Sequence, residues 1–118
     1  MSEKDLKISE MLEMSYDLWE ENKDSWSPME PEYGKDFILY MIEELGEVIA
    51  IIKKKSIKEI MDDQEIRGRF IEEMGDVLMY YVDILNRFDI SPKEFSKVYI
   101  EKFRHNMERD YKKQHADF

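Results

Sequence analysis

Two short acidic segments of the chain have nearly the same sequence and carry side chains that could bind a metal ion. Residues 42–49 read IEELGEVI and residues 71–78 read IEEMGDVL, with five identical positions and three conservative replacements. Side chains three positions apart lie on one face of a helix, about one turn from each other. The two acidic pairs that this spacing defines are Glu44 with Glu47 and Glu73 with Asp76.

The two pairs would converge if their helices form an antiparallel hairpin, because the midpoint between the segments falls at residue 60, in the connector. Carboxylates at about 4 Å repel one another by several kcal/mol at low dielectric, so a cation is expected between them. The chain has no cysteine, and its histidines, His105 and His115, lie outside both segments. Oxygen ligands alone favour Mg²⁺, with Mn²⁺ as a substitute. Mg²⁺ that is held by a few carboxylates commonly completes its coordination shell with water and phosphate oxygens, so the pattern predicts binding of a nucleotide polyphosphate.

Gly46 and Gly75 occupy the same place in the two segments. Each lies in the middle of a predicted helix, where glycine costs about 1 kcal/mol relative to alanine. The matched pair therefore predicts close approach by another helix or by a ligand. Glu-Glu pairs on helices are commonly solvated, so one segment alone would carry little weight, and the duplication is what favours a functional site.

Hydrophobic periodicity predicts four long helices and no strand. They cover residues 6–21, 35–54 and 64–87, followed by a helix that opens with the capping box Ser91-Pro92-Lys93-Glu94. Asp62 or Asp63 could cap the third helix. Residues 22–33 read as a loop, and the connector before residue 64 could hold a helical turn at 57–61. We expect an all-α, antiparallel four-helix bundle-like fold.

Composition narrows the class of protein. A chain of 118 residues with 42% hydrophobic residues suits one domain, 1–118, and its small size makes oligomerisation a reasonable expectation. The net charge of −10 argues against binding to nucleic acid. No apolar run reaches the roughly 20 residues that span a bilayer. Without a signal-peptide pattern, a cytoplasmic location and no membrane partner are expected. The charge is uneven, because cations outnumber anions in residues 91–113 and most of the acidic residues lie before them.

The acidic pattern resembles a known family. Glu43-Glu44-x-x-Glu47 followed by Glu73-x-x-Asp76 is similar to the paired motifs of the MazG-like, all-α nucleoside triphosphate pyrophosphohydrolases. The resemblance continues in Lys102-x-x-x-Asn106-x-x-Arg109, which is similar to the family's KxxxNxxRY element, although Asp110 separates Arg109 from Tyr111. Tyr80 matches a frequent tyrosine of the family. The likeness covers residues 38–111 and is weak before them.

The resemblance implies Mg²⁺-dependent hydrolysis of a nucleoside triphosphate to a monophosphate and pyrophosphate by a homodimer or homotetramer with sites near subunit contacts. It implies a role in removing non-standard, damaged or excess nucleotides. Metal ligands carried over from it are Glu44, Glu47, Glu73 and Asp76. Phosphate ligands carried over from it are Lys102, Asn106 and Arg109. Glu43 or Glu44 would accept a proton from the attacking water, and the residues themselves do not decide between the two.

The sequence allows more than one role for some aromatic residues and more than one function for the chain. Trp26 could stack on a base or cover the core, Trp19 fits the core, and Tyr80 could bind a ligand or border the core. A non-catalytic helical module could bind nucleotide or protein through the same acidic groove. A pyrophosphatase of the same fold could act on phosphoribosyl-ATP, dUTP or dCTP instead. The sequence does not fix the base or sugar that is preferred.

Overall fold

The computed structural model describes residues 4–109, and this part of the chain consists of helices and loops without strands. The helices are α1 (Ile8–Asn22), η1 (Pro31–Tyr33), α2 (Gly34–Lys54), α3 (Ile57–Asp62), α4 (Gln64–Arg87) and α5 (Pro92–Glu108). Where a helix end was predicted, it lies within two residues of the observed one, and the short turn expected at 57–61 is α3. The 3₁₀ helix η1 lies in the segment 22–33 that was expected to be a loop. The all-α class is therefore confirmed.

Side-chain caps begin the helices after the hairpin turn and after the last loop. The Asp63 carboxylate accepts hydrogen bonds from the backbone N–H groups of Glu65 and Ile66, at 3.0 and 3.1 Å. The Ser91 hydroxyl accepts one from the Glu94 N–H at 3.1 Å, as the capping box predicts. Each cap satisfies N–H groups that the first helical turn leaves without a partner. The cap of α4 is thus Asp63 rather than Asp62.

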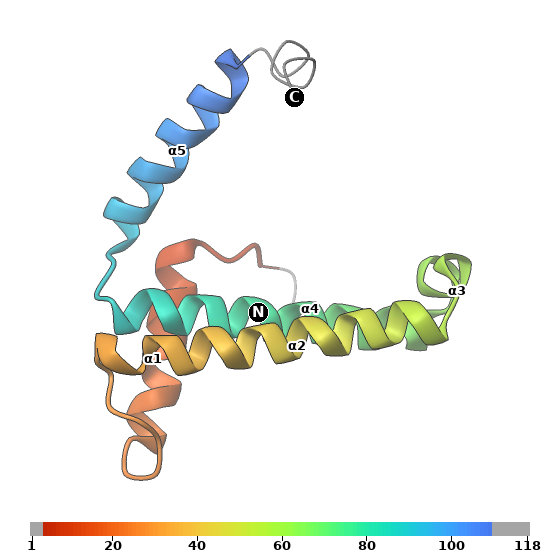
Figure 1. Ribbon diagram of the computed structural model, residues 1–118, viewed down its shortest axis with the longest axis horizontal. Coiled ribbons are helices and arrows are strands. Elements are labelled where there is room, and N and C mark those ends of the chain that lie inside the picture. Colours follow the sequence, from red (N-terminus) through yellow and green to blue (C-terminus); the bar gives the residue numbers. More distant parts are fainter. Residues whose placement is uncertain (1–3, 110–118) are drawn as a thin grey trace.

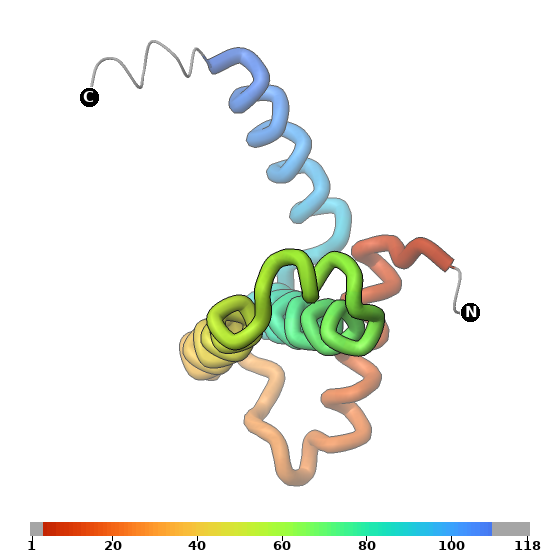
Figure 2. Tube along the Cα trace, turned by 90° about the vertical axis from the view of Figure 1, so that its right-hand side faces the viewer, coloured from red at the N-terminus to blue at the C-terminus, as the bar shows by residue number. Residues whose placement is uncertain are grey.

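The centre of the structure is an antiparallel hairpin of α2 and α4, which lie side by side along their length (Figure 1). The short helix α3 closes the hairpin at its tip, as the view along it shows (Figure 2). At the other end, Gly34 begins α2 directly beside the Phe88 ring. A Cβ at Gly34 would lie only 2.4 Å from that ring, so the close approach requires glycine.

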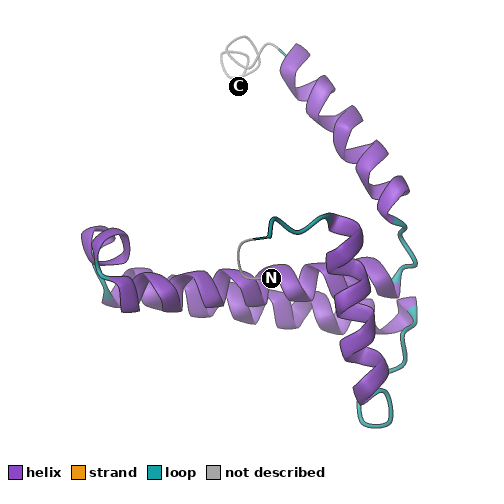
Figure 3. Cartoon of the chain, turned by 180° about the vertical axis from the view of Figure 1, so that it is seen from behind, coloured by secondary structure: helices purple, strands orange, loops and turns teal. Residues whose placement is uncertain are grey.

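The first helix packs across the open end of the hairpin (Figure 3). Leu12 of α1 is buried against Val82 and Leu85 of α4, and these three form the core cluster. The Asn86 side-chain amide donates a hydrogen bond to the Leu12 carbonyl oxygen at 2.9 Å. This packing places α1 next to the segment of α4 that follows the second acidic motif.

The last helix, α5, leaves the hairpin instead of packing along it (Figure 1). Its contact with α4 is near its start, where the Phe95 and Tyr81 rings are 6.2 Å apart. Four large apolar residues farther along α5 are 57–71% exposed: Val98, Tyr99, Phe103 and Met107. The single chain therefore forms a hairpin crossed by α1 rather than four helices closed around one core.

The hydrophobic periodicity of the helices explains this difference. Apolar residues at helical spacing show that one face of a helix is buried, but they do not show which element covers that face. Ile42, Ile49 and Ile71, all stripe or motif residues of the hairpin, are 51–56% exposed in the single chain. Among the described residues, no helix combines the length and the hydropathy needed to cross a membrane.

Candidate functional site

Three of the four predicted carboxylates meet across the hairpin. One oxygen each from Glu44 of α2 and from Glu73 and Asp76 of α4 lie within 4.8 Å of one another. The antiparallel pairing of α2 and α4 produces this cluster, because it sets the two acidic segments at the same height. We call these three residues the acid cluster.

The environment of Glu44 opposes its negative charge. Burial raises the pKa of the Glu44 carboxyl above its usual 4.5, and the charge of Asp76 and a hydrogen bond with Glu73 raise it further. Burial removes water that would stabilise the carboxylate, and like charges add repulsion. The acid cluster is therefore a place where either a proton or a bound cation is favoured.

The other two acidic candidates lie outside this group. Glu47 lies one helical turn closer to α3 than Glu44 and is exposed, although its charge also raises the pKa of Glu44. Glu43 is exposed as well. Its charge adds to the rise in the pKa of Tyr80, so it lies within electrostatic reach of that side chain. Neither carboxylate shares the close approach of the acid cluster.

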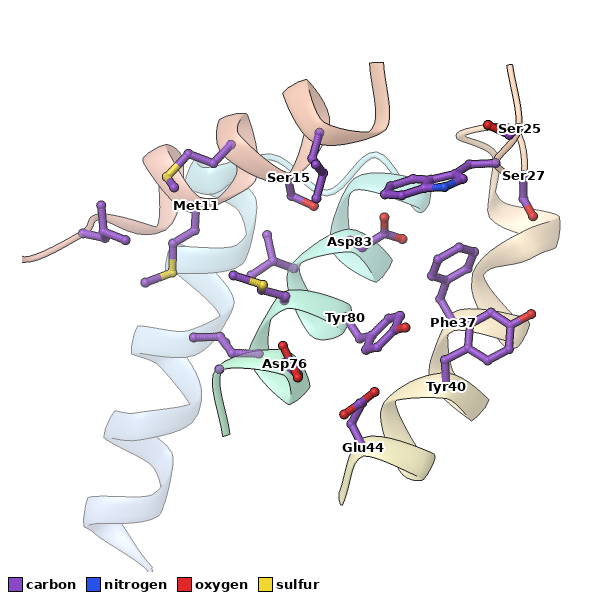
Figure 4. Close-up of a pocket in the computed structure, with 18 residues that line it drawn as sticks. Met11, Ser15, Ser25, Ser27, Phe37, Tyr40, Glu44, Asp76, Tyr80 and Asp83 are labelled. Carbon is purple, nitrogen blue, oxygen red and sulfur yellow. The ribbon is translucent and has the colours of Figure 1, made fainter. Parts of the chain in front are cut away.

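A cavity of about 960 Å³ that is partly open to solvent adjoins the acid cluster. It is lined by residues of α1, the loop that follows α1, α2 and α4 (Figure 4). Glu44 and Asp76 belong to both the cluster and the cavity wall. The aromatic side chains that line the cavity are Trp26, Phe37, Tyr40 and Tyr80. A wall of this kind suits a flat, apolar group bound beside a charged one.

Three of these rings pack against one another. The ring centres of Phe37 and Tyr40 are 5.2 Å apart, and the Tyr80 ring lies 6.2 Å from the first and 6.1 Å from the second. Burial raises the pKa of the Tyr80 hydroxyl, and the charges of Glu44 and Asp76 raise it further. Tyr80 therefore stays a neutral hydroxyl at the boundary between the acid cluster and the aromatic wall.

Phe37 and Tyr40 were not singled out from the sequence, although their spacing could have revealed them. Tyr40 precedes Glu44 by one turn and Phe37 precedes it by two, so all three lie on one face of α2. Both aromatic residues were hidden among the apolar stripe residues of the same helix, and only the position of α1 and its loop shows that this face borders a cavity.

The two tryptophans occupy different places. Trp26 is 41% exposed and lines the cavity, as a base-stacking residue would. Trp19 is half-buried, and its indole N–H donates a hydrogen bond to the Ser27 carbonyl oxygen at 2.8 Å. Trp19 thus ties the loop that carries Trp26 to α1.

The expectation that another helix approaches Gly46 and Gly75 is wrong for the described part of the chain. Outside its own helix, a Cβ at either glycine would meet no atom within 4 Å. The hairpin contacts use other faces of α2 and α4, so the glycines are not needed for this pairing. Gly75 lines the cavity, which leaves a ligand as the group that could approach it.

The predicted phosphate ligands are not brought to the acid cluster within one chain. Lys102 and Asn106 belong to α5 and Arg109 is its C-cap residue. None of the three lines the cavity. Lys102 is exposed, whereas Asn106 and Arg109 are half-buried. Because α5 leads away from the hairpin (Figure 1), the single chain does not bring these side chains to the acid cluster.

Comparison with known protein families places the region that holds the acid cluster in one of them. The sequence profile of the family described as the MazG nucleotide pyrophosphohydrolase domain matches residues 34–108, from the start of α2 to the end of α5. No curated protein and no solved structure matches the chain. The matched region contains the acid cluster, both acidic segments and α5, and it excludes α1 and Trp26.

Proposed function

The chain belongs to the MazG nucleotide pyrophosphohydrolase domain family, and on this premise we propose that it is a Mg²⁺-dependent nucleoside triphosphate pyrophosphohydrolase. Water would cleave the phosphoanhydride bond between the α and β phosphates of an NTP or dNTP, and the products would be the nucleoside monophosphate and pyrophosphate. The observation that supports this best is the position of the acid cluster at the edge of an aromatic cavity.

The donor set fits a hard divalent cation. The acid cluster offers carboxylate oxygens only, and its mutual repulsion favours a bound cation. Glu44, Glu73 and Asp76 would hold Mg²⁺, or Mn²⁺ in its place, and we include Glu47 as the fourth ligand. When bound, the ion supplies charge neutralisation on the phosphates and lowers the pKa of a coordinated water.

The chain's own side chains supply the remaining chemistry. Glu43 or Glu44 would accept the proton of the attacking water. The base would stack on the aromatic wall next to Trp26. The bound base and the aromatic side chains together would exclude water from that end of the site. Tyr80 would donate a hydrogen bond, because its hydroxyl keeps its proton. In this arrangement the base would lie at the aromatic wall and the phosphates at the acid cluster.

We also propose that the active form is a homodimer or homotetramer. The exposed apolar residues of α5 and the hairpin need a partner surface, and residues 91–113, which include α5, carry more cations than anions. A second copy could bring Lys102, Asn106 and Arg109 to the phosphates, where charge-assisted hydrogen bonds would hold the oxygens. Removal of unwanted nucleotides in the cytoplasm is the role that we assign to this activity.

A pyrophosphate-release assay on a panel of substrates tests the proposal. The panel holds the common NTPs and dNTPs, including dUTP and dCTP, several modified nucleotides and phosphoribosyl-ATP, each with Mg²⁺ and with Mn²⁺. We expect turnover that stops with EDTA and in the Glu73→Ala and Asp76→Ala variants. Titration calorimetry that finds metal and nucleotide binding without turnover would reject the enzyme in favour of a non-catalytic binding module.

A further inference from the structure

Arg87, near the end of α4, is the most deeply buried polar side chain among the described residues, at 1% exposure. Its Nε donates a hydrogen bond to the Asp83 Oδ1 at 2.5 Å. Its Nη1 donates to the Pro28 carbonyl oxygen at 2.6 Å and, over 3.4 Å, to that of Ser27. Its guanidinium carbon lies 3.7 Å from the centre of the Phe37 ring. One side chain therefore joins α4, α2 and the loop after α1.

Three of the four residues that Arg87 contacts line the cavity, whereas Pro28 and Arg87 itself do not. Ser27, Phe37 and Asp83 are all part of the cavity wall, at the end away from the acid cluster (Figure 4). Trp26, which also lines the wall, directly precedes the Ser27 carbonyl that accepts hydrogen bonds from both Arg87 and Trp19. The loop is thus tied to α4 and to α1 at the same point.

An arginine is a costly residue at a buried place. A buried charge is tolerated only with a partner and good hydrogen bonds, and an apolar residue of similar volume is often equally stable there. Its planar fork, however, fixes several acceptors in defined directions and stacks on an aromatic ring, which neither lysine nor an apolar side chain does. The contacts of Arg87 through Nε, Nη1 and the face of its guanidinium use these properties, and those with Ser27, Phe37 and Asp83 bear on the cavity wall.

We propose that Arg87 is a positioning residue for the nucleoside end of the substrate. Through the loop carbonyls and the Phe37 ring, it holds Trp26 and Phe37 at the spacing that admits a nucleobase, so that the cavity is formed before the ligand arrives. A preformed slot lowers the entropy cost of binding. This inference rests on the proposed function in one respect only, that the cavity binds a nucleoside.

The test measures base binding without catalysis. The affinities of the four common deoxynucleoside monophosphates are measured in EDTA by titration calorimetry, and Mn²⁺ affinity is measured separately. For Arg87→Lys, we expect the tightest monophosphate to bind about tenfold more weakly, since lysine lacks the planar fork that fixes the loop carbonyls and stacks on Phe37. Mn²⁺ affinity should stay within about twofold, because Arg87 does not contact the acid cluster. Arg67→Lys, at an exposed position of α4, is the matched control and should change neither.

A double-mutant cycle separates positioning from general stability. If Arg87 acts through Trp26, Arg87→Lys should weaken monophosphate binding much less when Trp26→Ala is already present. Trp19→Phe removes the other donor to Ser27 without disturbing a buried charge, so it should weaken binding in the same direction even if Arg87→Lys does not fold. Unchanged monophosphate affinity in the folded variants, additive effects in the cycle, or an equal loss of Mn²⁺ affinity would each overturn the inference.

The same measurements keep the inference distinct from the proposed function. A wild-type chain that binds a monophosphate but releases no pyrophosphate from the substrate panel would reject the proposed function and leave the Arg87 comparison in force. A wild-type chain that releases pyrophosphate but binds none of the monophosphates would overturn the inference alone.

Discussion

The segments 42–49 and 71–78 are almost identical in sequence, yet they contribute unequally to the site. The second supplies two carboxylates to the acid cluster, Glu73 and Asp76, whereas the first supplies only Glu44. A symmetrical hairpin would pair Glu44 with Asp76 and Glu47 with Glu73. The structure instead gathers both α4 acids around Glu44 and leaves Glu47 exposed toward the hairpin tip.

A second asymmetry lies outside the repeat. The first helix packs on α4 at one end of the hairpin, and together with its loop it creates a cavity that Glu44 and Asp76 also line. No second helix does the same near Glu47 in the described residues. A duplicated motif can therefore provide carboxylates twice, while the surrounding elements decide which of them line a cavity.

The largest expected effect is the loss of an acid-cluster member from the second segment. Asp76→Asn keeps the shape of the side chain but removes a charged metal ligand, so we expect metal affinity and turnover to fall by about 100-fold or more. Loss of a residue that only hydrogen-bonds a metal ligand typically costs about 10–100-fold, and loss of the ligand itself should cost more. Mn²⁺ titration and pyrophosphate release measure the two. Asp62→Asn, exposed at the hairpin tip, is the control. A fall of less than tenfold would remove Asp76 from the ligand set.

The equivalent change in the first segment should be milder. Glu47→Gln alters a carboxylate outside the acid cluster. We expect metal affinity and turnover to fall by about tenfold, which is the low end of the range for residues that support a metal site. Measured beside Asp76→Asn under the same conditions, it sharpens the comparison directly. Equal losses would show that the metal-loaded site restores the symmetry of the repeat.

The pH dependence of stability should single out Glu44. Because its pKa is raised in the folded protein, the folded state holds a proton that the unfolded state has already lost. Its contribution to stability is therefore complete below the usual pKa of 4.5 and is lost as the pH rises through the raised value. In EDTA, urea unfolding of the wild type should show this loss, and Glu44→Gln should not. Added Mg²⁺ should cancel it.

A wild-type stability curve that rises over this pH range in EDTA, with the same slope in Glu44→Gln, would contradict the assignment of repulsion to Glu44.

Separate activity assays of Glu43→Gln and Glu44→Gln bear on the identity of the residue that accepts the proton of the attacking water. Loss of turnover with intact Mn²⁺ affinity would identify the base, whereas loss of both would identify a ligand.

The smallest expected effect compares the two glycines. Replacing either by alanine should stabilise the metal-free chain by about 1 kcal/mol, since neither Cβ meets another atom in the described structure. Gly75→Ala should reduce activity as well, because Gly75 lines the cavity and Gly46 does not. Thermal unfolding and turnover of both variants measure the difference. Equal activity would show that no ligand approaches Gly75.

Periodicity and caps made the helices predictable to within two residues, because these signals are local. The meeting of Glu44 with Glu73 and Asp76 was predictable too, since one short connector leaves an antiparallel hairpin as the simple arrangement. The direction of α5 was not, because its apolar stripe shows only that a face requires a partner. Phe37, Tyr40 and Arg87 were missed, since their importance depends on a loop and a helix distant from them in sequence.

Local sequence signals account for the helices, for the carboxylates of the two acidic segments and for the spacing that sets these segments at one height, because each follows from helical geometry over a few turns. Long-range packing, in contrast, determines which acids lie close together, where the aromatic wall lies and why Arg87 is buried. Those features depend on where α1 and its loop pack on the hairpin, and such long-range packing leaves no periodic signal in the chain.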